Sequence, residues 1–244
     1  MSLILALLLA CGSPAAQAEA PAAPAAAPAA SSPAAAPAPQ VAPAAEALPE
    51  LPADANPALL DPSLAQEQAP DKYRVRFHTT QGDVVVAVYR SLSPNAADRL
   101  YNLVRIGFFD DVSFFRVIPG FMAQFGVSGY PQVNEAWREA RMPDDPVLSG
   151  NQRGHLTMAM AGPGTRTTQF FINFKDNTQL DGMGFTSFGE VVEGMEVVDS
   201  LYGGYGEGAP RGSGPDQGKL LQRGNPWLKA NFPKLDAIQS ATVE

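Results

Sequence analysis

Residues 114–124 read Phe-Phe-Arg-Val-Ile-Pro-Gly-Phe-Met-Ala-Gln and are the most informative stretch of the chain. An arginine lies among aromatic and β-branched residues, and a Pro-Gly turn separates it from a second apolar segment that carries one glutamine. Because burying an unpaired guanidinium costs much free energy, a permanent cation here needs either solvent or a polar role at the wall of a pocket. The pattern predicts two short strands joined by a turn.

A second informative region follows about 45 residues later. Residues 158–165 read Met-Ala-Met-Ala-Gly-Pro-Gly-Thr, and residues 168–173 read Thr-Gln-Phe-Phe-Ile-Asn. Together with the first stretch they resemble the signature blocks of the cyclophilin family of peptidyl-prolyl cis-trans isomerases. The family pattern reads roughly F-H-R-V-I-P-G-F-M-x-Q in the first block and M-A-N-A-G-P-x-T-x-x-S-Q-F-F-I in the second. The resemblance extends over about residues 73–202.

The expected fold is mainly β. Residues 73–78 alternate between apolar and polar, which is typical of a half-buried strand, and residues 84–89 form a more buried second strand. Ser93 before Pro94 predicts a helix start, and many short strands with two helices suggest an antiparallel barrel. The resemblance implies the same architecture, a closed eight-stranded antiparallel barrel capped by two helices.

The resemblance also implies the site. Arg116 is expected to be the catalytic donor, and Gln124 is expected to lie beside it and to bond both Arg116 and the substrate. The residues that the family would use to hold the proline ring are Phe121, Met122, Phe171 and Leu180, and those that would line the peptide groove are Ala159, Met160 and Gln169. Strand alternation independently places Met122 and Gln124 on one face. No metal or other cofactor is expected.

Each assignment has a simpler structural alternative. Taken alone, Arg116 would more often be an edge-strand cation, and the apolar residues would more often be plain core. Gln124 and Gln169 alone would be ordinary solvated or backbone-bonded amides. Their joint occurrence in the family's order is what favours a site.

Three positions depart from eukaryotic members of the family. Phe115 stands in place of a histidine, and Met160 in place of an asparagine whose backbone binds substrate. Gln179 replaces the tryptophan that helps to bind cyclosporin. These changes bear on drug sensitivity and substrate preference more than on activity.

Composition divides the chain. Residues 1–70 hold 13 of the 23 prolines, no Lys, Arg or His and no aromatic residue, whereas all 17 basic residues follow. An Ala/Pro-rich segment without aromatic residues cannot bury enough apolar surface to offset its ordering entropy. The chain is therefore expected to comprise an export signal (1–12), a disordered linker (13–70), a cyclophilin-like isomerase domain (71–202) and a C-terminal extension that packs on the barrel (203–244).

The N-terminal segment predicts export. Residues 3–10 are apolar but too few to span a bilayer, and Leu-Leu-Ala-Cys-Gly at 8–12 resembles a bacterial lipobox. Cys11, the single cysteine, would then carry lipid and anchor the protein to a membrane. A competing cleavage site, Ala-Gln-Ala at 16–18, would release a free exported protein. Either of these outcomes places the protein in the periplasm or cell envelope, and a cytoplasmic protein is the remaining alternative.

The leading interpretation is an isomerase that assists the folding of proline-containing polypeptides in the cell envelope. Two alternatives are a proline-peptide binding chaperone and a structural lipoprotein with little turnover. No basic patch points to nucleic acid, and we expect a monomer.

Overall fold

The first two strands form the hairpin that the alternating pattern predicts. In the computed structural model, which describes residues 48–244, β1 (Lys72–Thr79) alternates between buried and more exposed residues and pairs antiparallel with β2 (Gly82–Tyr89). Gly82 adopts a φ of 132°, which L side chains rarely tolerate, and the Thr79 hydroxyl donates a hydrogen bond to its carbonyl. This turn fixes the register of the hairpin.

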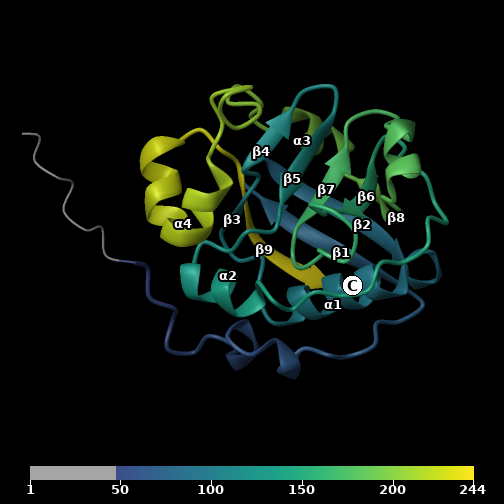
Figure 1. Ribbon diagram of the computed structural model, residues 1–244, viewed down its shortest axis with the longest axis horizontal. Coiled ribbons are helices and arrows are strands. Elements are labelled where there is room, and N and C mark those ends of the chain that lie inside the picture. The colour runs from purple at the N-terminus through teal and green to yellow at the C-terminus, as the bar shows by residue number, and fades with distance from the viewer. Residues whose placement is uncertain (1–47) are drawn as a thin grey trace, which may run out of the picture. The chain divides into compact units, whose positions relative to one another are not determined.

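All the strands belong to one antiparallel sheet (Figure 1). The order of strands across it is β3-β9-β1-β2-β8-β6-β7-β5-β4. The remaining strands are β3 (Val112–Ser113), β4 (Arg116–Ile118), β5 (Met122–Phe125), β6 (His155–Met158), β7 (Phe170–Asn173), β8 (Ser187–Glu193) and β9 (Ala237–Val243). The prediction of a mainly β, antiparallel architecture is confirmed, but the described residues contain nine strands rather than eight.

The two outermost strands of the sheet are neighbours in sequence. β3 ends at Ser113 and β4 begins at Arg116, so only Phe114 and Phe115 separate them. β3 and β4 are the two edge strands of the sheet. Within the described residues, the covalent chain rather than hydrogen bonds connects these two edges of the curled sheet. The apolar stretch before the Pro-Gly turn is therefore divided into β3 and β4 at the residues that make this connection.

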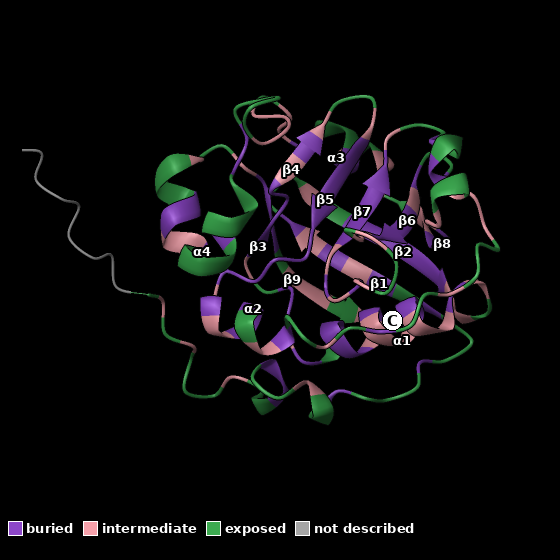
Figure 2. Cartoon of the chain, viewed as in Figure 1, coloured by how far each residue is buried: buried purple, intermediate pink, exposed green. Residues whose placement is uncertain are grey.

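The inside of the curled sheet is filled by aromatic side chains. Phe77, Phe109, Phe125, Phe170 and Phe188 are each at most 1% exposed. Phe77 and Phe125 pack edge-on with 5.6 Å between ring centroids, and Phe125 and Phe170 are stacked at 6.0 Å. Figure 2 shows that β5 and β7 are buried along their whole length. The core is thus rigid behind the face that carries the site.

Within residues 48–244, four α-helices lie around the sheet: α1 (Pro94–Arg105), α2 (Pro131–Trp137), α3 (Met195–Ser200) and α4 (Gln217–Asn231), the last broken at Gly224. The predicted start of α1 is correct, but Ser93 does not cap it with its own side chain. The Asp145 carboxylate instead accepts hydrogen bonds from the Ser93 hydroxyl at 2.5 Å and from the Asn95 amide at 3.0 Å. α2 lies in the stretch between β5 and β6. No helix among residues 48–244 is long and apolar enough to span a membrane.

The predicted linker differs from the structure at its C-terminal end. Residues 57–59 and 62–64 form short 3-10 helices, and Ala58, Leu59, Ala65 and Ala69 are buried in the main core. The buried indole of Trp137 donates a hydrogen bond to the Leu59 carbonyl at 3.1 Å. Small apolar side chains can pack closely without aromatic anchors of their own, so composition alone was misleading here. Residues 13–47 of the predicted linker, the export signal and Cys11 lie outside the described residues.

The predicted end of the isomerase domain at residue 202 is also wrong. β9 lies between β3 and β1, so the extension supplies an internal strand of the sheet. Leu220, Trp227 and Leu228 form a buried cluster with Phe115 and Val127, and Phe232 packs against it. The residues expected to pack on the barrel thus do so, but the extension is an integral part of the fold (Figure 1). Local sequence pattern could not reveal a strand whose partners lie so far away along the chain.

Candidate active site

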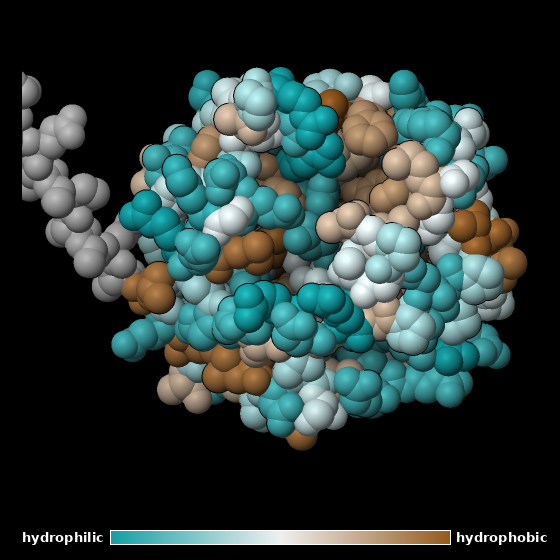
Figure 3. Space-filling view, viewed as in Figure 1, coloured by the Kyte–Doolittle hydropathy of each residue, from teal (hydrophilic) through white to brown (hydrophobic). Residues whose placement is uncertain are grey.

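A cavity of about 520 Å³ opens beside β4, β5 and β7. Apolar and hydrophilic side chains meet at a hollow over β5 and β7 in the space-filling view (Figure 3). All nine side chains predicted for the site line this cavity: Arg116, Phe121, Met122, Gln124, Ala159, Met160, Gln169, Phe171 and Leu180. The structure therefore brings the predicted set together, although their roles remain predictions.

The register of three strands places the polar and apolar parts side by side. Arg116 of β4 lies opposite Gln124 of β5, and Gln124 lies opposite Phe171 of β7. Residues directly opposite one another in an antiparallel sheet project from the same face. One row across the sheet therefore carries a cation, an amide and an aromatic ring.

The apolar part of the cavity, here called the proline seat, is formed by Phe121, Met122, Phe171 and Leu180. Met122, Phe171 and Leu180 are buried together, separately from the main core, and half-buried Phe121 packs against them. Phe185, which sequence reasoning did not assign, packs edge-on against Phe171 with 5.8 Å between ring centroids. The seat is thus a preformed apolar surface.

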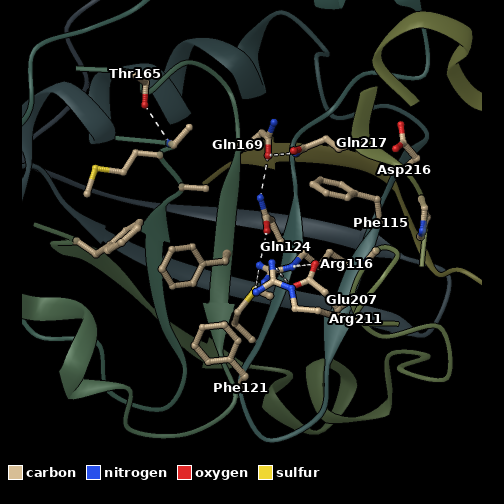
Figure 4. Close-up of a pocket in the computed structure, with 18 of the residues that line it drawn as sticks. Phe115, Arg116, Phe121, Gln124, Thr165, Gln169, Glu207, Arg211, Asp216 and Gln217 are labelled. Carbon is tan, nitrogen blue, oxygen red and sulfur yellow. Dashed lines mark hydrogen bonds and ion pairs between the residues drawn. The ribbon is translucent and has the colours of Figure 1, made fainter. Parts of the chain in front are cut away.

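A chain of hydrogen bonds crosses the polar side of the cavity (Figure 4). Arg116 Nη1 donates to Gln124 Oε1 at 2.9 Å, and Gln124 Nε2 donates to Gln169 Oε1 at 2.8 Å. Gln217, at the start of α4, donates to the same Gln169 oxygen at 2.8 Å. These bonds hold both glutamine side chains in fixed orientations.

Glu207 is the site residue that sequence reasoning missed. Arg116 Nε donates to its Oε1 at 2.8 Å, and Arg116 Nη2 donates to its Oε2 at 2.6 Å. The bond from Arg116 is the main reason that the pKa of Glu207 lies below the usual range, so the carboxylate stays charged at neutral pH. Glu207 belongs to the Gly- and Pro-rich part of the extension, and nothing in its local sequence marks it.

The three departures from the family pattern occupy different places. Phe115 is buried against the C-terminal cluster, and Met160 is half-buried at the cavity wall. Gln179 is exposed in a 3-10 helix over residues 178–183 and does not line the cavity. The Arg116 guanidinium, the Gln124 and Gln169 amides and the apolar seat lie together in the cavity, which suits it to bind a neutral peptide group next to a ring.

Comparison with known proteins agrees with this geometry. Residues 74–214 match the model of the family described as cyclophilin type peptidyl-prolyl cis-trans isomerase/CLD. Peptidyl-prolyl cis-trans isomerase B of Escherichia coli is 36% identical over 137 residues, covering 53% of this chain and 84% of that protein. Peptidyl-prolyl cis-trans isomerase-like 3 of Gibberella zeae is 39% identical over 137 residues, covering 52% of this chain and 81% of that protein.

A solved structure shares the fold. The crystal structure of a cyclophilin type isomerase of Cryptosporidium parvum superposes with a TM-score of 0.52 at 22% identity, covering 71% of this chain and 98% of that one. The family match, the relatives and the shared fold lead to one conclusion. This chain belongs to the family of cyclophilin-type peptidyl-prolyl cis-trans isomerases.

Proposed function

We propose that this protein catalyses cis-trans rotation about X-Pro bonds in proteins of the cell envelope and so assists their folding. The observation that carries the isomerase activity is the Arg116–Gln124 pair beside the proline seat in one cavity. Rotation about an X-Pro bond is slow because amide conjugation imposes a barrier of roughly 18–20 kcal/mol. A catalyst of this step needs no nucleophile and no proton transfer.

Catalysis follows from binding the twisted amide better than the planar one. The proline seat holds the ring, so the residue before proline can turn relative to it. As the bond twists, the prolyl nitrogen becomes pyramidal and gains a lone pair, and a donor directed at it stabilises that state selectively. Arg116 is the donor, because its guanidinium lies next to Met122 of the seat, with Nη1 3.8 Å from the sulfur.

The two glutamines orient this arrangement. Gln124 bonds Arg116 through its oxygen, and its nitrogen is held by Gln169. The amide plane of Gln124 is therefore fixed before substrate arrives, which reduces the reorganisation required in the transition state. Gln169 and Ala159 line the same cavity and form the wall along which the peptide lies.

The activity is tested with a proline-containing tetrapeptide in a protease-coupled assay. Arg116→Ala should lower kcat/KM at least about tenfold because the lost interaction acts in the transition state. Its far-UV circular dichroism should stay unchanged, because the Arg116 side chain is only half-buried and contributes nothing to the apolar core. Wild-type activity in the Arg116→Ala variant would refute the mechanism. A wild-type protein without activity would refute the proposed function.

The proposal that the protein acts in the cell envelope is supported by the sequence alone. The apolar run ending in Leu-Leu-Ala-Cys supports lipid attachment at Cys11, which lies outside the described residues. Intact-mass analysis of the protein from its native host decides between the two forms. An acylated chain that starts at Cys11 supports a membrane tether, whereas an unmodified chain that starts at Glu19 supports a free exported protein.

A further inference from the structure

Glu207 makes the most extensive polar contact with Arg116, and it comes from outside the strands that build the cavity. It lies in the segment between α3 and α4, here called the tail loop (residues 203–216). Its carboxylate meets the guanidinium side-on, through Nε and Nη2, with side-chain exposures of 22% for Glu207 and 28% for Arg116. A two-point contact of a carboxylate with a guanidinium fixes direction as well as distance.

The tail loop holds Glu207 at this place from both sides. Gly206, with a φ of 62°, turns the chain just before Glu207, a conformation that a glycine adopts without steric cost. The Glu207 carbonyl accepts a hydrogen bond from the Gly214 amide at 2.8 Å, and the Glu207 carboxylate accepts one from the Gly208 amide at 3.1 Å. The carboxylate is therefore directed by its own backbone and not only by Arg116.

An aromatic contact ties the tail loop to the body of the protein. Tyr205 packs edge-on against Phe232 with 5.2 Å between ring centroids, and Phe232 packs against Trp227 of α4 at 5.5 Å. Trp227 lies in the buried cluster that includes Phe115, one residue before Arg116. Glu207 is thus connected to the same packed unit that carries β4.

The guanidinium is held on two edges by this arrangement. Arginine has five N–H donors in a rigid fork. Glu207 takes one donor on Nε and one on Nη2, and Gln124 takes one on Nη1. The second N–H of Nη2 has no partner among the described residues, so a donor remains for the substrate.

The tail loop leaves the proline seat open. Ala209 and Pro210 lie at the rim of the cavity and are exposed, whereas the seat is formed by residues of other elements. Glu207 therefore acts on Arg116 and does not fill the place of the substrate ring. Glu207 bonds the guanidinium through Nε and Nη2, whereas Gln124 bonds it through Nη1 (Figure 4).

We propose that Glu207 is a positioning residue for the isomerase reaction: it fixes the Arg116 guanidinium between itself and Gln124, so that the remaining donor faces the prolyl nitrogen. This inference rests on the proposed isomerase function. A freely rotating arginine side chain would have to be ordered in each turnover, whereas a guanidinium fixed in advance requires no such reorganisation. Loss of Glu207 should therefore lower the rate of rotation about the X-Pro bond and leave the affinity for the proline ring unchanged.

The test uses Glu207→Ala and the isosteric Glu207→Gln in the full chain. Glu207→Ala should lower kcat/KM about three- to tenfold, and Glu207→Gln should lie between it and the wild type, because the amide keeps only one acceptor. The dissociation constant of a proline peptide, measured by NMR titration, should change less than about twofold since the proline seat is intact. The 15N–1H signal of the Arg116 Nε group should broaden or shift when the bidentate partner is lost.

The matched control is another two-point ion pair. Asp199 accepts from Arg153 Nη1 at 3.0 Å and from Nη2 at 2.6 Å, and neither residue lines the cavity. Asp199→Ala should leave kcat/KM unchanged. Circular dichroism and thermal unfolding of each variant show whether a loss of activity reflects a loss of fold.

A double-mutant cycle separates the possible outcomes. If Glu207 acts only through Arg116, then adding Glu207→Ala to Arg116→Ala should cause no further loss beyond about twofold. The proposal is overturned if Glu207→Ala and Glu207→Gln are as active as the wild type or more active, while Arg116→Ala is impaired. It is also overturned if Glu207→Ala causes the same loss in the Arg116→Ala background. An unimpaired Arg116→Ala variant would instead refute the proposed mechanism itself.

Discussion

Arg116 and Gln124 are directly opposite each other in the β4–β5 ladder, and their side chains meet at 2.9 Å. The pair is therefore set by the register of the backbone. A shift of one residue in this register would turn one of the two side chains to the other face of the sheet. The short turn between β4 and β5 fixes both members of the pair at once.

Replacing Arg116 with lysine should rescue only part of the activity. An ammonium group keeps the charge but lacks the planar fork that reaches Glu207 and Gln124 together. We expect kcat/KM of Arg116→Lys to lie between those of Arg116→Ala and the wild type in the protease-coupled assay. Full activity of the lysine variant would show that charge alone suffices.

The rate should be nearly independent of pH between about pH 6 and 9, because guanidinium, amide and apolar groups do not titrate there. Glu207 is the titratable partner, and its pKa is lowered mainly by its bond to Arg116. A lowered pKa means that the Arg116–Glu207 pair is fully formed above the unfolded-state value of about 4.5 and is lost only as pH falls through the lower folded-state value. NMR exchange measurements on a proline peptide test this, and a bell-shaped profile would contradict it.

Removal of residues 237–244 should prevent folding. This change deletes β9, which separates β3 from β1 and pairs with both. The deletion leaves two strand edges unpaired and removes Ile238, whose side chain is completely buried in the core. We expect no cooperative thermal transition, and a cooperative transition near that of the full chain would contradict the assignment of β9 to the sheet.

A chain that begins at residue 71 should fold but be less stable than one that begins at residue 48. It lacks Leu59 and three buried alanines, and it leaves the indole N–H of Trp137 without its carbonyl acceptor. Burial of one leucine is worth about 1.5–3 kcal/mol, so a loss of several kcal/mol in the free energy of unfolding is expected. Urea unfolding measures the difference. The kcat/KM should be unaltered, since none of residues 48–70 lines the cavity.

Cyclosporin should bind far more weakly than to family members that carry a tryptophan at the position of Gln179. The glutamine side chain offers neither the indole N–H nor a large apolar face, and it is exposed beside Leu180 of the proline seat. Calorimetric titration measures the affinity, with Gln179→Trp as the matched variant that should bind more tightly. Equal affinities in the two proteins would exclude a role for this position.

The parts of the fold that the sequence predicted correctly depend on local patterns. Alternation over 73–78 gave the hairpin, and the two signature stretches gave the cavity residues, including the Met122 and Gln124 side chains on one strand. Proline at the start of α1 marked that helix correctly. Each of these features is encoded within a short stretch of the chain.

The parts that could not be predicted depend on contacts between distant segments. Glu207 reaches Arg116 across 91 residues, and the carboxylate at the start of α1 comes from Asp145, which is 52 residues from Ser93. The buried alanines before β1 follow no periodic pattern, because they belong to an irregular segment rather than to a strand or a long helix. Sequence spacing carries no information about contacts between residues so far apart along the chain.

The position of β9 also constrains how the sheet can assemble. Arg76 of β1 bonds Glu244, 168 residues away, so one edge of β1 has no strand partner until nearly the whole described chain has been made. Pairing across so long a separation is slow, because loop-closure entropy must be overcome first. During that interval β1 presents an open edge to other unfolded chains, which is the arrangement that leads to aggregation. Expression conditions that slow synthesis or sequester nascent chains should therefore influence the yield of this protein more than changes at its cavity.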